Sequence, residues 1–452
     1  MKNDRRTIFG WAMYDWANSA YSTTIASAVL PALFAEEIVP DTGYEVFGRV
    51  FSGETLWAAV VGVGALLLFL ATPVLGAIAD FSATRRRFLI AFATIGSLAS
   101  AALALMGPGD VALTLAVFLV AQMGFVGANV FYDGFLPAIA TDDTIDRVSS
   151  QGYALGYIGG GLQLLLAALV ILFHGSLGLT EIGAARIGIA MAGVWWFGFG
   201  WYAFSMIPEV GSASPLPDRY AGLPRIAAYA AVGFRRTAAT ARRLVGFKHL
   251  ALFLLAFMFF NDGIQTVINL SAVYAADTLD LSAATILGAL LVVQFVAYVG
   301  ALAFGWLAGR VGPKPALMAS LVAWIAAAIA AFAVPAGAVA AFYAVAAFVG
   351  FILGGAQALA RSLYGSMIPE EASAEFYGFY AVFAKFSAIW GPLIFAVISG
   401  ATGSGRPAIL SIVVFFVIGL ALVARVDVEE ARASRLRWAF DEDGVRAADG
   451  PG

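Results

Sequence analysis

The chain has 452 residues, of which 61% are hydrophobic and only 12% are charged, and its mean hydropathy is +0.88. A soluble fold of this length does not need so much apolar surface, whereas helices in contact with lipid do. The formal net charge of −3 argues against a nucleic-acid partner, and the lack of cysteine excludes disulfides and thiolate chemistry. Two histidines far apart in sequence, His174 and His249, predict neither a metal site nor a cofactor.

Twelve apolar windows of about 20 residues follow one another and predict twelve transmembrane helices. The first window follows a basic start, as a cleaved signal peptide would, but Asp15, Asn18 and Ser19 interrupt its apolar region, so we expect it to be retained. The windows are 9–34, 53–79, 87–106, 111–136, 150–174, 186–207, 249–276, 282–308, 315–334, 338–363, 374–400 and 407–424.

The placement of lysine and arginine predicts the topology. With the N-terminus inside, 21 of these residues fall in cytoplasmic segments, against three in the outer segments, Arg49, Arg186 and Arg406. Such an asymmetry is a strong positive-inside signal. We therefore expect both termini to be cytoplasmic.

The two groups of six windows repeat one polar pattern. An aspartate followed three residues later by an amide occurs early in the first window, as Asp15 and Asn18, and again in the seventh, as Asp262 and Gln265. A carboxylate at membrane depth costs roughly 2.5–3.5 kcal/mol unless it faces a partner or water. Its occurrence at two equivalent positions suggests a duplicated polar pathway, and six windows per half predict two parallel repeats.

A second repeated pattern follows the second and eighth windows. In the first half Gly76 leads through Asp80 to the basic cluster 85–87, and in the second half Gly305 leads to Lys314. We therefore divide the chain into four parts: an N-terminal six-helix bundle (1–207), a cytoplasmic linker (208–248), a C-terminal six-helix bundle (249–424) and a cytoplasmic tail (425–452). The linker is proline-rich and then basic, which fits either an amphipathic helix on anionic membrane lipid or a simple tether.

Two six-helix halves joined by a basic linker, with the loop from Gly76 through Asp80, resemble the major facilitator superfamily over essentially the whole chain. The opening run 14–21, Tyr-Asp-Trp-Ala-Asn-Ser-Ala-Tyr, resembles the branch that contains fungal vacuolar amino-acid effluxers and their bacterial relatives. The resemblance implies alternating access around a central cavity, a bacterial inner (plasma) membrane, and an architecture for which a monomer suffices. Because Gly309 stands where the first half has Asp80, we expect a full charge network only in the first half.

The repeated loops and one pair of embedded charges are the predicted gate. The first loop suits a latch that holds one conformation, or a cluster that only fixes topology. Asp133 and Arg361 lie at matching depths in the fourth and tenth windows, where they suit a salt bridge between the halves, or separate pairing near the headgroups. The predicted gating residues are Gly76, Asp80, Arg85, Arg86, Asp133, Arg361, Gly305 and Lys314.

Opposite charges near mid-bilayer suit a zwitterionic substrate. Lys385 suits a carboxylate and Asp262 or Asp15 an ammonium group, although Lys385 and Asp262 could equally form a permanent pair. The same carboxylates are candidates to carry a coupling proton. Proximity to Asp15 adds two aromatic residues, and the predicted substrate-binding set is Asp15, Asn18, Asp262, Gln265, Lys385, Trp16, Tyr21, Asn129 and Gln357.

The sequence therefore predicts a secondary active transporter and not an enzyme. It contains no phosphate-binding GxxxxGK[ST] run and no HExxH motif, so ATP-driven transport and metalloprotease chemistry are not expected. The expected substrate is an amino acid or a similar zwitterion, and a proton is the candidate coupling ion. An exporter of a lipid, siderophore or drug-like compound, or a non-transporting scaffold or sensor, are the alternatives, although the embedded charges argue against the last.

Overall fold

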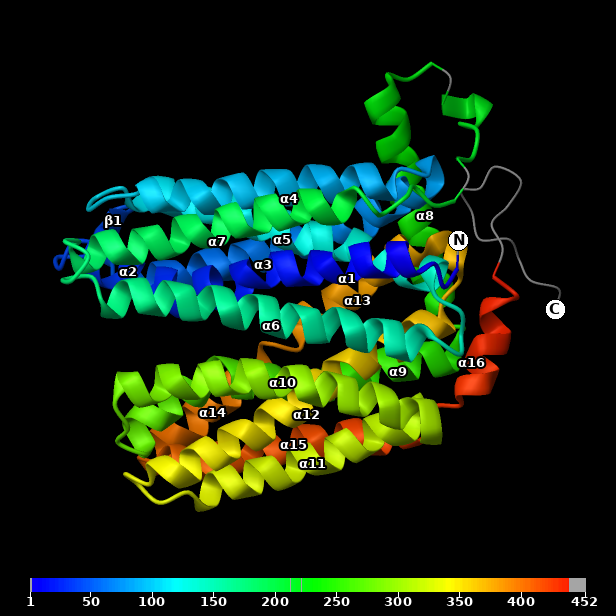
Figure 1. The fold of residues 1–452 in the computed structure, drawn as a ribbon. Coiled ribbons are helices and arrows are strands. Elements are labelled where there is room, and N and C mark those ends of the chain that lie inside the picture. Colours follow the sequence, from blue (N-terminus) through cyan, green and yellow to red (C-terminus); the bar gives the residue numbers. More distant parts are fainter. Residues whose placement is uncertain (1, 212, 221, 439–452) are drawn as a thin grey trace.

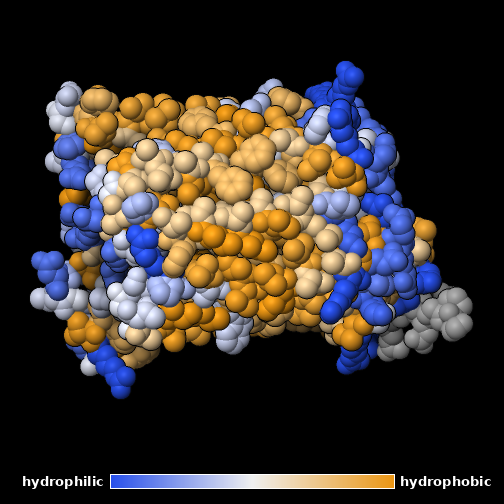
Figure 2. All heavy atoms as spheres, turned by 90° about the horizontal axis from the view of Figure 1, so that it is seen from below, coloured by the Kyte–Doolittle hydropathy of each residue, from blue (hydrophilic) through white to orange (hydrophobic). Residues whose placement is uncertain are grey.

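The computed structural model describes residues 2–211, 213–220 and 222–438, which fold into helices apart from one small hairpin. Eleven helical segments of this part are long and apolar enough to cross a membrane. The remaining predicted span is the first along the chain, 9–34. It lies in one continuous helical stretch that is more polar than the other spans, since it carries Asp15, Asn18 and several hydroxyl groups. A broad apolar belt separates two polar ends of the molecule (Figure 2).

The first half of the chain supplies six spans around one core. The first span runs through α1 (Arg5–Ala20), the π-helical η1 (Tyr21–Val29), α2 (Leu30–Leu33) and the π-helical η2 (Phe34–Ile38). A hairpin that the sequence did not suggest follows, with β1 (Tyr44–Val46) antiparallel to β2 (Arg49–Phe51). The other spans are α3 (Gly53–Ser82), α4 (Arg85–Ala102, continued by η3, Leu103–Leu105), α5 (Val111–Ile139), α6 (Ile145–Leu172) and α7 (Glu181–Phe204).

The second half repeats this arrangement after a linker that contains η4 (Asp218–Tyr220) and the helix α8 (Arg225–Leu244). Its eleventh span is divided into two helices, α13 and α14, which the sequence windows did not predict. The elements of the second half are α9 (Lys248–Val273) with η5 (Tyr274–Thr278), α10 (Ala283–Val311), α11 (Pro313–Ala333), α12 (Val339–Met367), η6 (Glu370–Ala372), α13 (Ser373–Phe386), α14 (Trp390–Thr402) and α15 (Gly405–Ala424).

The tail begins with α16 (Val428–Arg435), while residues 439–452 of the predicted tail lie outside the described residues. The two halves lie one above the other in Figure 1, and each has its own hydrophobic core. The start of α1 lies at the same end of the bundle as α8 and α16, and we call this the termini end. The opposite end carries β1 and β2, and we call it the hairpin end (Figure 1).

Capping and small residues explain why the helices begin and pack as they do. At the hairpin end, the hydroxyl of Ser52 accepts the N–H of Thr55 at the start of α3, and Ser282 and Thr285 do the same at the start of α10. Inside the second half, a Cβ on Gly354 would lie 2.2 Å from the carbonyl oxygen of Ala297, so only glycine permits this approach of α12 to α10. These local features set the positions from which the central side chains point.

Candidate substrate cavity and gate

A cavity of about 610 Å³ lies between the halves. It is lined by α1 and η1, α5 and α6 from the first half and by α9 with η5, α10, α11, α12, α13 and α15 from the second. At the hairpin end its lining includes Ser27, Tyr274 and Val334, and toward the termini end it includes Asp133 and Arg361. Seven of the nine predicted substrate-binding residues line it: Asp15, Asn18, Tyr21, Asn129, Gln265, Gln357 and Lys385.

Arg361 occupies the floor of the cavity and joins the two halves. Its Nη1 lies 3.2 Å from Oδ2 of Asp15 and 3.2 Å from Oδ1 of Asp133, so one nitrogen serves both carboxylates. The Nε donates to the Ser149 hydroxyl at 3.0 Å and Nη2 donates to the Ser149 carbonyl at 2.8 Å. The structure thus contains an ion pair between Asp133 and Arg361, the contact that their matching depths allow. Asp15 forms a second ion pair with the same guanidinium. Because the guanidinium is 3% exposed, these bonds compensate the loss of its hydration.

Aromatic rings surround the same guanidinium. The carbon Cζ of Arg361 lies 4.1 Å from the ring centre of Tyr153 and 4.8 Å from that of Trp11, distances at which a cation is attracted to a ring face. The hydroxyl of Tyr132 donates to Oδ2 of Asp15 at 2.8 Å. Trp11 and Ser149 were not found from the sequence, since neither is charged, Trp11 lies within an apolar window and Ser149 lies just before one.

Neutral polar pairs line the cavity between this floor and the hairpin end. The amide of Asn18 donates to Asn129 at 2.8 Å, and the Tyr21 hydroxyl donates to Gln122 at 2.8 Å. One such bond crosses between the halves, from the Tyr157 hydroxyl to Gln357 at 2.5 Å. These amides and hydroxyls offer both donors and acceptors to a polar solute.

Lys385 lies on the cavity wall at the end of the half-helix α13. Among the residues that the structure describes, no carboxylate forms an ion pair with it. The unsatisfied carbonyls at a helix C-terminus carry partial negative charge, which favours a lysine in the last turn. The permanent pair between Lys385 and Asp262, one of the two alternatives from the sequence, is therefore not formed in this structure.

Asp262 bonds to the start of α14, across the break that separates α13 from α14. Its Oδ1 accepts the N–H of Gly391, in the first turn of α14, at 2.8 Å, while the neighbouring Asn261 donates to the Ser387 hydroxyl at 2.6 Å. A carboxylate at a helix N-terminus satisfies free N–H groups and opposes the positive end of the helix dipole. Asp262 is 1% exposed and lies outside the cavity lining, so this conformation does not place it where a solute in the cavity would contact it.

Trp16 also lies outside the cavity lining. Its ring stacks on Trp195 with the centroids 5.6 Å apart and meets Phe199 edge to face. One residue after Asp15 is a rotation of about 100° around a helix, which turns Trp16 toward α7 instead of the cavity. Its predicted substrate contact is therefore not supported by the geometry.

The loop after α3 closes the termini end. The carboxylate of Asp80 forms a 2.5 Å ion pair with Nε of Arg85 and accepts the backbone N–H of Glu375, in α13 of the other half, at 2.9 Å. Arg85 also donates to the carbonyl of Glu370 at 2.8 Å, again across the halves. A Cβ on Gly76 would lie 2.4 Å from the carbonyl oxygen of Ala374, so this glycine lets α3 and α13 touch.

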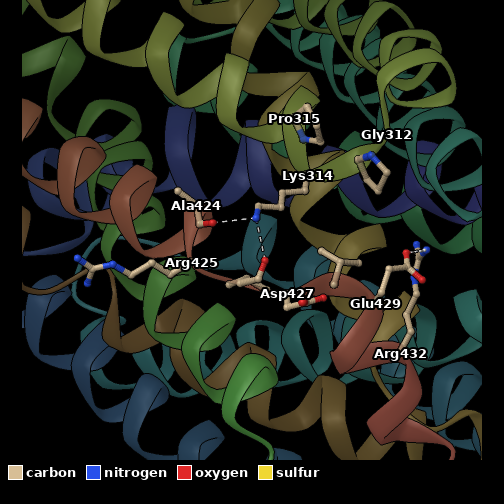
Figure 3. A pocket seen from close by; sticks show the side chains of 11 residues that line it. Gly312, Lys314, Pro315, Ala424, Arg425, Asp427, Glu429 and Arg432 are labelled. Atoms are coloured by element: carbon tan, nitrogen blue, oxygen red, sulfur yellow. Dashed lines mark hydrogen bonds and ion pairs between the residues drawn. The ribbon is translucent and has the colours of Figure 1, made fainter.

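The other predicted gating residues divide between inter-half and local contacts. A Cβ on Gly305 would lie 2.5 Å from Oγ of Ser150, so Gly305 also allows close contact between the halves. Arg86, however, donates to the carbonyl of Phe204 at 3.0 Å, within its own half. Lys314 donates to the carbonyls of Ala424 and Val426, each at 2.8 Å, and Figure 3 shows its side chain directed at the end of α15.

Arg86 and Lys314 therefore tie each loop to its own half, and in this conformation neither of these bonds crosses between the halves. The asymmetry follows from Gly309, which cannot provide the carboxylate that Asp80 provides. Two further inter-half ion pairs at the termini end were not found from the sequence. Lys2 pairs with Glu370 at 2.8 Å, and Arg435 of α16 pairs with Asp142 at 2.5 Å.

Two parallel six-helix halves around a charged cavity that is closed at one end define a transporter of the major facilitator superfamily. Solved structures agree in fold: the proton:xylose symporter XylE superposes with a TM-score of 0.69 over 95% of this chain and 98% of its own, at 13% identity. The transporter FucP in the outward conformation gives 0.67 over 94% and 100%, at 12% identity. The predicted all-α fold with two six-helix repeats is confirmed.

The chain belongs to the family described as vacuole effluxer Atg22 like, whose sequence profile matches residues 3–435. It is 32% identical over 430 residues, 95% of this chain and 96% of the relative, to a Bacillus subtilis (strain 168) protein named "Uncharacterized MFS-type transporter YxiO". It is 25% identical to autophagy-related protein 22 of Coccidioides immitis (strain RS), over 96% of this chain and 82% of the relative. The predicted superfamily and branch are confirmed, and the chain is a transporter and not an enzyme.

Proposed function

We propose that this transporter carries a small zwitterion, with an amino acid as the first candidate, by alternating access. The arrangement of charges in the cavity carries this proposal. Lys385 has no ion-pair partner among the described residues, and Arg361 shares one nitrogen between Asp15 and Asp133. The cavity thus offers a free cation to a carboxylate and two carboxylates to an ammonium group.

Binding at these charges would couple the substrate to the gate. An ammonium group that approaches Asp15 or Asp133 competes with Arg361 for the same carboxylate. Because Arg361 belongs to α12 and both aspartates belong to the first half, this competition weakens an attraction between the halves. A ligand shifts a conformational equilibrium only through such differential contacts.

A coupling proton would act on the same pair. Protonation of Asp15 or Asp133 removes one negative charge from beside Arg361. Like an ammonium group, the proton therefore weakens the attraction between the two halves. Either aspartate is therefore the proposed proton carrier. Efflux is the direction that the family's description supports, and the distribution of basic residues favours a cytoplasmic termini end in the bacterial plasma membrane.

Reconstitution tests the proposal directly. The purified chain is placed in proteoliposomes and challenged with a panel of labelled amino acids, with and without an imposed pH gradient. We expect saturable transport of at least one amino acid, stimulation by the gradient, and a higher KM in Lys385→Gln. Lys248→Gln, which removes an exposed lysine at the start of α9, is the matched control and should behave as the parent.

Transport of a lipid or an uncharged drug-like compound, with no amino acid transported, would overturn the zwitterion proposal and favour the exporter alternative. Amino-acid transport that survives Lys385→Gln unchanged would overturn the assignment of Lys385. The absence of transport for every solute class, in protein that is folded and reconstituted, would favour the scaffold alternative.

A further inference from the structure

The linker helix α8 presents a buried face to the transporter at the termini end. Val232 is buried with Phe81 in a small core, and a Cβ on Gly233 would lie 2.6 Å from Cγ1 of Ile78, so α8 packs tightly against α3. On the same face, Nε of Arg236 forms a 2.9 Å ion pair with Glu375, and both side chains are at most 4% exposed. The helix therefore contacts both halves, α3 of the first and α13 of the second.

This contact belongs to the closed gate described above. The carboxylate of Glu375 accepts the Nε–H of Arg236, and the backbone N–H of Glu375 donates to Asp80, so the two bonds meet at one residue. If the halves separate at the termini end, α13 moves away from α3. The helix α8 must then leave either its seat on α3 or its ion pair with Glu375. It is thus a clasp on the closed state.

The opposite side of α8 is unusual for a surface in water. Phe234 is 63% exposed and Val245 79%, and their spacing of about three turns places both in one row, while Ile226, which is 88% exposed, lies at the start of the helix. The basic residues Arg235 and Arg242, both exposed, lie on the adjoining side. An apolar row beside a basic row is the pattern of helices that lie in the lipid headgroup layer.

We propose that α8 docks on anionic phospholipid, and that this docking stabilises the closed termini end. The apolar row would enter the headgroup and acyl boundary while the arginines contact lipid phosphates. The position of α8 supports this, because the helix packs on α3, itself a membrane span, at the end of the bundle seen in Figure 1. Charge supports an anionic lipid surface as the partner, since the exposed charges of this side are basic. The inference concerns the linker and does not depend on which solute is carried.

Depth-dependent quenching tests the docking. The chain has no cysteine, so Ala241→Cys, two helical turns after Phe234, gives one site for a fluorophore on the apolar row. In liposomes that contain an anionic phosphatidylglycerol and brominated acyl chains, we expect strong quenching at this site. Glu371→Cys, an exposed position between the halves, is the control and should be quenched less. Equal quenching at the two sites would overturn the docking.

Charge removal then identifies the lipid chemistry. Arg235→Gln with Arg242→Gln should weaken the association of α8 with anionic liposomes by about fivefold for each charge, and neutral phosphatidylcholine liposomes should show no such difference. Because Arg235 also donates to the Tyr220 hydroxyl at 3.2 Å, Tyr220→Phe is the matched control that loses this bond but keeps both charges. An effect of Tyr220→Phe as large as that of the double variant would overturn the electrostatic assignment.

A distance measurement tests the link to the gate. Spin labels at Asp143→Cys in the first half and Glu371→Cys in the second report separation of the halves at the termini end. We expect a larger fraction of short distances in anionic than in neutral liposomes, and we expect the Arg235→Gln, Arg242→Gln variant to lose this lipid dependence. A distance distribution that is the same in both lipids would overturn the clasp, whatever solute the protein transports.

Discussion

The two repeated aspartates occupy matching helices and have different roles. Asp15 lines the cavity and pairs with Arg361 of the other half, whereas Asp262 is buried in its own half and holds the start of α14. The eleventh span breaks after Lys385, and the fifth span, α6, is continuous over 28 residues. The break creates free N–H groups that need an acceptor, and Asp262 supplies it. The two aspartates lie in corresponding helices, and the neighbouring helices determine what each carboxylate binds.

The break also places two opposite charges without pairing them. Lys385 ends α13, where the helix dipole is negative, and Asp262 caps α14, where it is positive. Each charge is stabilised by a helix end, so the lysine remains free for a ligand. Discontinuous helices near the middle of the membrane are common at transporter binding sites for this reason.

The largest expected effect comes from removing the cation at the floor of the cavity. Arg361→Met leaves Asp15 and Asp133 close together and unpaired, and breaking a buried pair in this way costs about 3–5 kcal/mol. We expect transport to be lost and the melting temperature in detergent to fall. Adding Asp15→Asn and Asp133→Asn should recover part of the stability but no transport. A single Arg361→Met variant as stable as the parent would contradict the arrangement.

A matched pair of substitutions tests the comparison of the aspartates. Asp15→Asn removes a charge that faces both Arg361 and the cavity, so we expect transport to fall by about tenfold or more. Asp262→Asn keeps an oxygen that can accept the N–H of Gly391, so transport should stay within about threefold of the parent. Initial transport rates at saturating solute decide between them.

At Asp262 we expect a substitution to change the stability of the protein more than its transport rate. Asp262→Ala leaves the first turn of α14 without its acceptor and should cost about 1–3 kcal/mol, seen as a lower melting temperature than that of Asp262→Asn. Larger transport defects in Asp262→Asn than in Asp15→Asn would show that the roles of the two residues are reversed.

A smaller effect is expected at the free lysine. Lys385→Gln removes an unpaired cation at membrane depth, which should leave stability unchanged or raise it. The KM for a zwitterionic solute should rise by about tenfold, with a smaller change in the maximal rate. If Lys385 were instead paired permanently with Asp262, the substitution would destabilise the protein, so a fall in melting temperature would contradict the structure.

Much of the fold could be predicted because lipid imposes length and polarity on every span. The windows, the repeat and the embedded charges all follow from the cost of polar groups in a bilayer. The same reasoning placed Asp133 and Arg361 at matching depths, and the structure brings them to 3.2 Å. Depth is readable from sequence because it depends only on distance along the helix.

The direction in which a side chain points was less readable. Trp16 follows Asp15 directly, and one step around the helix sends it to Trp195 instead of the cavity. The break after Lys385 is followed by Gly391 and Pro392 in the first turn of α14, so the window 374–400 did contain a sign of it, which the count of apolar residues does not use. The break also depends on Asn261 and Asp262, which come from a helix more than a hundred residues earlier in the chain. Such long-range contacts cannot be found in one sequence.

The smallest expected effect separates the two repeated loops. Asp80→Asn loses the ion pair with Arg85 at the inter-half contact, whereas Lys314→Gln loses bonds inside one half. Ser150→Cys is a suitable reporter, because Ser150 is buried against Gly305 and its hydroxyl has no hydrogen-bond partner among the described residues. With Asp80→Asn, a water-soluble maleimide should modify this cysteine about fivefold faster.

Lys314→Gln should leave the rate of modification unchanged, since its contacts with Ala424 and Val426 do not cross between the halves. Each variant removes one charge from one copy of the loop. Equal acceleration by both would show that the second loop also takes part in closing the termini end. Acceleration by Asp80→Asn alone would show that the carboxylate missing at Gly309 is what confines the latch to the first copy.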